Sequence, residues 1–208
     1  MVYENDIFKI FYNECDKEYI SQVINELNSV IHSYLDFFSI DKLEDIVVIK
    51  FYDSLDDFKI YYEERKKRSY DGKTVGRAEG NKIHMLSFKE RIKVRPNDTL
   101  VEFIMGIKHE LVHICHIAYK GNSHGTWFAE GLATNLGSPR YEETLDGCTL
   151  EELLHKSKYK YCYTLAKYML ENYTHEQILE YAYDDNKLLK DTDKILEEAK
   201  EYYRHLKL

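Results

Sequence analysis

Two histidines four residues apart, His109 and His113, have the type and the spacing needed to bind one metal ion. On an α-helix, residues at this spacing stand about 6 Å apart along the axis and about 40° apart around it. Their imidazole groups can therefore bind a single zinc ion at bond lengths of about 2.0–2.1 Å. Glu110 stands about 100° further round the helix, where it flanks the ion instead of binding it. That is the position of a general base for a zinc-bound water in the His-Glu-x-x-His pattern.

A further carboxylate, Glu130, follows in the segment Trp-Phe-Ala-Glu-Gly-Leu-Ala at 127–133. A catalytic zinc usually has three protein ligands and keeps a fourth position for water. Glu130 is the best candidate for the third ligand, because a carboxylate among apolar neighbours is costly to bury unless it is paired or metal-bound. An ordinary exposed helix glutamate is the alternative interpretation.

Other histidines near the pattern are weaker candidates. His116 shares the helix face, but it lies about 10 Å along the axis from His109, a poor fit for one tetrahedral site. A structural or supporting role is therefore expected for His116. His124 could reach the site from a loop, although an exposed loop histidine is the favoured interpretation. A shuffled chain of this composition contains His-Glu-x-x-His about 0.04 times, so a charged helix face with two solvated histidines stays an alternative.

The residues before the pattern predict a mixed α/β lobe. Strands are expected at 7–12 and 46–51, where apolar and β-branched residues gather. An amphipathic helix is expected at 16–38, and a second helix, capped by Asp53 or Ser54, extends to about residue 67. The segments 75–79 and 82–87, joined by Gly80-Asn81, predict a hairpin.

The residues that follow the His-Glu-x-x-His pattern predict a helical lobe. The helix with the two histidines is expected to begin at Asn97 or Asp98 and to stop at Gly121, and Thr126 caps the next helix, which extends to about residue 136. Further helix starts are predicted at Thr149, at Thr174 and at Asp191 or Thr192, with a tyrosine-rich helix at 159–172 between the first two. We therefore expect one domain over 1–208, with an α/β lobe at 1–121 and a helical lobe carrying the third ligand at 122–208.

Composition excludes several classes of protein. The chain has 208 residues, of which 44% are hydrophobic and 32% charged, as in soluble globular proteins. Its net charge of −8 argues against a nucleic-acid or anionic-membrane partner. It has no secretory signal and no apolar run long enough to cross a bilayer. The four cysteines form no Cys-x-x-Cys pair, so reduced thiols in a cytoplasmic protein are expected, with Cys115 in a packing role.

The two motifs together resemble those of the gluzincin metallopeptidases, in particular the small peptidase-MA-like domains. The resemblance implies a thermolysin-like α+β catalytic domain, with a small mixed sheet and the active-site helix in the N-terminal lobe and helices in the C-terminal lobe. It implies that His109, His113 and Glu130 bind Zn²⁺ and that Glu110 is the general base. The segment 77–85 is similar to the family's edge strand, which pairs with bound peptide as an added strand.

The resemblance also implies a tyrosine or histidine that donates to the oxyanion. Tyr163 and Tyr161 are the candidates by position, with core packing as the alternative for each. The chain lacks a Gly-x-Met-Glu-Asn segment, which aminopeptidases use to anchor a substrate amino group, and this favours an endopeptidase.

The expected function is therefore that of a cytoplasmic zinc metallopeptidase that hydrolyses peptide bonds in a peptide or protein substrate. A zinc-binding sensor or interaction domain without peptidase activity is one alternative, and a metal-free helical scaffold is another.

Overall fold

The computed structural model describes residues 1–121, 126–139, 143–154 and 160–206. These residues form two compact units, Met1–Cys115 and His116–Leu208. The division falls inside helix α4 (Leu100–Lys120), a few residues before the lobe boundary expected from the sequence. Secondary structure in the described residues is mixed α+β, as predicted, and its strands all belong to the first unit.

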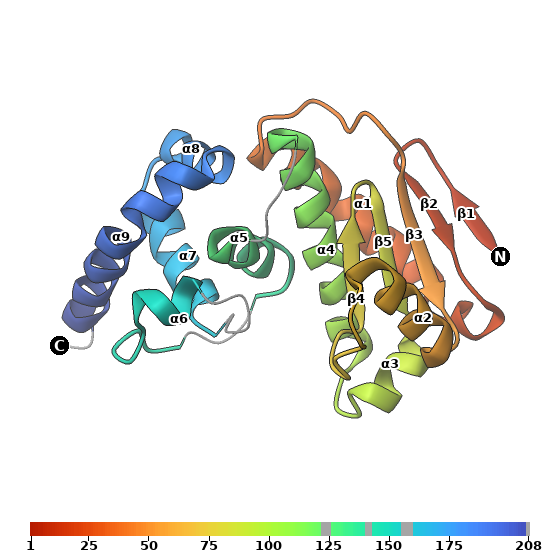
Figure 1. Cartoon of the computed structure of the whole chain (residues 1–208). Coiled ribbons are helices and arrows are strands. Elements are labelled where there is room, and N and C mark those ends of the chain that lie inside the picture. The colour runs from red at the N-terminus through yellow and green to blue at the C-terminus, as the bar shows by residue number, and fades with distance from the viewer. Residues whose placement is uncertain (122–125, 140–142, 155–159, 207–208) are drawn as a thin grey trace. The chain divides into compact units, whose positions relative to one another are not determined.

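A five-stranded mixed sheet is the centre of the first unit (Figure 1). The strand order is β1-β2-β3-β5-β4, in which β2, β3 and β5 are parallel and the two outer strands are antiparallel to their neighbours. The strands are β1 (Val2–Glu4), β2 (Phe8–Phe11), β3 (Val47–Tyr52), β4 (Gly76–Glu79) and β5 (Lys82–Leu86). Four of them match the predicted segments to within one residue, and β1 was not predicted because its three residues include no buried position.

Helices α1 (Ile20–Phe37) and α4 lie on one face of this sheet, and α2 (Leu55–Lys66) lies on the other (Figure 1). Alternate strand residues such as Ile10, Ile49 and Ile83 are fully buried on the α1–α4 face. Phe103 of α4 meets Phe51 of β3 there, with ring centroids 5.4 Å apart. This apolar contact places α4 beside the sheet.

A second cluster joins α2 to the opposite face. Its buried members are Tyr52, Phe58, Val75 and Leu86. Ser54 caps α2 as predicted, because its side chain accepts a hydrogen bond from the backbone N–H of Asp57. The predicted hairpin is also present, and Gly80 has the positive φ of 57° that a primed two-residue turn requires.

The start of α4 differs from the prediction. Thr99 caps this helix in place of Asn97 or Asp98, through reciprocal bonds with Glu102. Asp98 is used instead in an ion pair with the buried Arg91 side chain, 2.6 Å away. Arg91 belongs to helix α3 (Phe88–Val94), which follows β5 and was not predicted.

The described residues of the second unit are helical. The elements that follow the last turn of α4 are α5 (Trp127–Gly137), α6 (Leu150–Leu154), α7 (Cys162–Asn172), α8 (His175–Tyr183) and α9 (Asp185–Leu206). The predicted caps Thr126, Thr149 and Thr174 are all present. Helix α9 begins before the predicted Asp191 or Thr192, because Asp184 accepts bonds from the N–H groups of its first turn.

The prediction that Cys115 has a packing role can be checked directly. Cys115 is fully buried in a packing position, and all four cysteines are free thiols. In the part of the chain that the structure describes, no helix has the length and apolar character that crossing a membrane requires.

Candidate metal centre

Helix α4 brings the two ring nitrogens of the pattern together. The Nε2 atoms of His109 and His113 lie 3.2 Å apart, and the ring planes are inclined by 82°. Two ligands bound at about 2.0–2.1 Å to one tetrahedral ion lie about 3.3 Å apart. The two imidazoles therefore already have the separation that one zinc ion demands of them. Leu111 and Val112, between them in sequence, are buried and hold this orientation of the helix.

The carboxylate of Glu110, the next residue after His109, contacts the edge strand of the sheet. Its Oε2 accepts a hydrogen bond of 2.7 Å from the backbone N–H of Ala78 in β4. The contact keeps the carboxylate at the sheet edge next to the histidines, as a general base requires. Sequence reasoning did not single out Ala78, because the two residues are 32 positions apart and their contact leaves no local pattern.

Glu130 occupies a half-buried position in the first turn of α5. Thr126 begins this helix by accepting a bond from the N–H of Ala129, and the residues on both sides of Glu130 are buried. Cys162 of α7 lies nearby, and burial, followed by the charge of Glu130, raises the pKa of its thiol to about 12. That thiol is therefore protonated near neutral pH.

His109, His113 and Glu130 together form a group that could hold a metal ion. One ligand atom from each lies within 4.8 Å of the others, and all three side chains are partly exposed. Two nitrogen ligands and one oxygen ligand suit zinc, and other divalent ions of the first transition row as well. Glu110 is not a member of this group, and its role as the general base stays a prediction.

His116 has a structural role. It is 3% exposed, and its Nε2 lies 2.7 Å from the carbonyl oxygen of Ala182 in α8. Because a carbonyl only accepts hydrogen bonds, Nε2 carries the proton and cannot bind a metal in this arrangement. His124 lies outside the described residues.

The two candidate oxyanion donors both lie at the start of α7. Tyr161 is 8% exposed, and its hydroxyl oxygen lies 3.8 Å from where a Cβ on Gly147 would be. Tyr161 is thus part of the packing of the second unit. Tyr163 is partly exposed, and its backbone carbonyl accepts a bond from the side chain of Asn135. A role of Tyr163 toward substrate stays a prediction.

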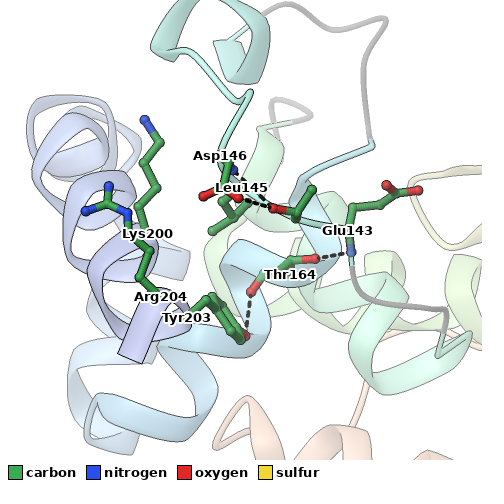
Figure 2. A pocket seen from close by; sticks show the side chains of 8 residues that line it. Glu143, Leu145, Asp146, Thr164, Lys200, Tyr203 and Arg204 are labelled. Carbon is green, nitrogen blue, oxygen red and sulfur yellow. Dashed lines mark hydrogen bonds between the residues drawn. The ribbon is translucent and has the colours of Figure 1, made fainter. Parts of the chain in front are cut away.

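A small pocket in the second unit is separate from these residues (Figure 2). It measures about 150 Å³, and both carboxylates and cations line it, among them Glu143, Asp146, Lys200 and Arg204. The Thr164 hydroxyl in its wall accepts a bond from the N–H of Glu143. With charges of both signs and none of the predicted site residues, this pocket provides no argument for a reaction.

Comparison of the chain with protein-family models, curated proteins and solved structures gives no match. The function is therefore argued from the geometry of the chain's own residues.

Proposed function

We propose that this chain is a zinc metallopeptidase of the gluzincin type that cleaves peptide bonds within a chain. The observation that supports this most is the 3.2 Å separation of the His109 and His113 Nε2 atoms, with Glu110 held beside them by Ala78. Glu130 is the proposed third ligand, since its carboxylate completes the only ligand group found among the described residues.

Zinc bound by these residues would polarise a water molecule and the scissile carbonyl. Glu110 takes a proton from the attacking water as the new C–O bond forms. It then delivers this proton to the amine nitrogen that leaves when the C–N bond breaks. Tyr163 is the proposed hydrogen-bond donor to the oxygen that becomes negatively charged.

The substrate is proposed to bind in an extended conformation along β4. This strand is at the edge of the sheet, with β5 as its partner on one side. Val75 accepts a backbone bond from Leu86 of β5, so by alternation Gly76 and Ala78 direct their backbone groups away from the sheet. The N–H of Ala78 donates to Glu110, so the proposed peptide pairs with the outward groups of Gly76 and with the carbonyl of Ala78. A peptide added at this edge passes next to Glu110, as the resemblance to gluzincins implies.

The test combines metal content with turnover. We expect the purified protein to contain stoichiometric zinc by mass spectrometry of its metals, and to cleave members of a mixed peptide library. His113→Ala should lose both properties. Glu110→Gln should keep the zinc and lose about 100-fold or more in hydrolysis, because the general base is removed without a metal ligand. Glu64→Gln, at an exposed position of α2, is the matched control and should behave as the wild type.

Full hydrolysis by the Glu110→Gln protein would refute this mechanism. Stoichiometric zinc without turnover of any peptide would instead support the alternative of a zinc-binding sensor or interaction domain.

A further inference from the structure

Arg77 is a charged residue on the edge strand β4, next to the residue that holds Glu110. It pairs with His84 of β5, so both side chains lie on the α2 face of the sheet. Ala78 has the opposite orientation, and its N–H reaches Glu110 on α4. A strand added beyond β4 would therefore place one of its side chains next to Arg77, on the face turned toward α2.

One nitrogen of the Arg77 guanidinium lacks a hydrogen-bond partner. Its Nη1 atom is buried and has no hydrogen-bond acceptor. Glu79 lies on the same strand face, but its Oε2 accepts from the Tyr61 hydroxyl at 3.2 Å and faces Arg65 at 3.4 Å. A buried charged donor without an acceptor costs free energy. An anion bound at the exposed part of this guanidinium would offset part of that cost by balancing its charge.

The groups around Arg77 make this part of the sheet electropositive. Lys50, His84 and Arg77 form one row across β3, β5 and β4. Burial lowers the pKa of His84 to about 4, with Lys50, Lys82 and Arg65 acting in the same direction and Glu79 against it. Its ring also stacks on Tyr61 at 4.0 Å and bonds to the Tyr52 hydroxyl. At neutral pH the row therefore carries two positive charges, those of Lys50 and Arg77. The carboxylate of Glu79 lies near them.

We propose that Arg77 is a specificity-determining residue that binds an acidic side chain, Asp or Glu, of a peptide lying along β4. This inference rests on the proposed function, since it assigns a substrate class to the same site. Directly opposed residues of neighbouring strands have Cβ atoms about 4.5–5.5 Å apart, within reach of a carboxylate–guanidinium pair. Arg77 is partly exposed, and its charge is delocalised over a planar group that binds carboxylates through two parallel bonds.

The experiment measures binding and cleavage separately. The zinc-loaded Glu110→Gln protein is titrated, by fluorescence anisotropy, with pairs of labelled peptides that differ by Glu or Gln at one position, scanned along the peptide. At one position we expect the Glu peptide to bind about tenfold more tightly, the lower end of what a hydrogen bond to a charged group contributes. Adding Arg77→Met should abolish this preference, and Arg77→Lys should restore part of it.

Lys82→Met is the matched control, since it removes an exposed cation from the same sheet face. It should leave most of the preference intact. Circular dichroism of each variant checks that the fold is retained, and Arg77→Gln serves in place of Arg77→Met if the latter does not fold.

The proposal is overturned if no position prefers Glu, or if the preference survives the loss of the Arg77 charge. Cleavage of the same peptides by the wild type distinguishes the two proposals. Turnover without an acidic preference refutes the role of Arg77 alone, whereas an Arg77-dependent preference without turnover supports that role and refutes the peptidase.

Discussion

At the scale of single residues, the proposed chemistry depends on three side chains of α4 and on one backbone N–H. His109 and His113 present their Nε2 atoms to one point, and the N–H of Ala78 holds the carboxylate of Glu110 beside them. These contacts are made inside the first unit, so the base and two of the proposed ligands are positioned by the same sheet and helix. A base set in this way needs little rearrangement before it takes a proton.

His84 predicts a pH dependence of stability at the same scale. Its folded pKa of about 4 is below the ordinary value of 6.5, so the unfolded chain binds more protons between these two values. The stabilisation of the fold by the neutral His84 ring is therefore complete above about pH 6.5 and is lost as the pH falls toward 4. After allowance for partial exposure, we expect a loss of about 1–2 kcal/mol from this group.

The measurement is the free energy of unfolding by urea at several pH values from 7.5 to 4.5, for the wild type and for His84→Gln. The difference between the two proteins isolates His84 from other titrating groups. As the pH falls from 7.5 to 4.5, the difference in unfolding free energy between the wild type and His84→Gln should narrow by about 1–2 kcal/mol. A difference that stays constant with pH would show that His84 does not remain neutral in the fold.

At the scale of elements, the close approach of α5 to α7 depends on Gly131. A Cβ on this residue would lie 2.6 Å from the carbonyl oxygen of Cys162 and 2.5 Å from the Cβ of Ala166. Replacing a helix glycine by alanine in open space gains about 0.5–1 kcal/mol. Here the contacting atoms are backbone and Cβ atoms that cannot rotate away, so the steric cost exceeds this gain.

We therefore expect Gly131→Ala to lower the unfolding free energy by about 1–3 kcal/mol, the usual cost of overpacking. Thermal unfolding followed by circular dichroism measures the effect. Gly147→Ala is the control, because its Cβ would meet the Tyr161 hydroxyl at an ordinary contact distance of 3.8 Å. Equal stability of Gly131→Ala and the wild type would mean that the helices separate easily at this point.

At the scale of the whole molecule, the proposed ligands belong to both compact units, with His109 and His113 in the first and Glu130 in the second. A ligand that binds the folded chain but not the unfolded chain stabilises the fold by about 2.7 kcal/mol when its free concentration is 100 times its Kd. For a protein of this size, that corresponds to a rise in Tm of about 5–10 °C.

Removal of the metal with a chelator, followed by addition of zinc, tests this expectation. The Tm of the wild type should fall on chelation and recover on addition of zinc, and His113→Ala should show neither change. If the wild type responds no more than this variant, the folded chain does not bind zinc at the proposed site.

Features that depend on residues within one helical turn could be predicted from the sequence. The spacing of His109 and His113 determines that they share a helix face, and the caps at Ser54, Thr126 and Thr174 are bonds to residues three positions away. The half-buried position of Glu130 follows in the same way from its apolar neighbours. Such patterns are visible because an α-helix brings residues three and four apart together in any protein.

Features that depend on distant contacts required the tertiary structure. Thr192 was a predicted helix start, but it lies within α9, where its hydroxyl accepts a bond from the Trp127 indole. The bond from Ala78 to Glu110 and the unpaired Nη1 atom of Arg77 arise because β4 is the outer strand beside α4. Residue types alone do not reveal which strand is outermost. The sequence by itself therefore determined the proposed ligands and base, and the tertiary structure decided what surrounds them.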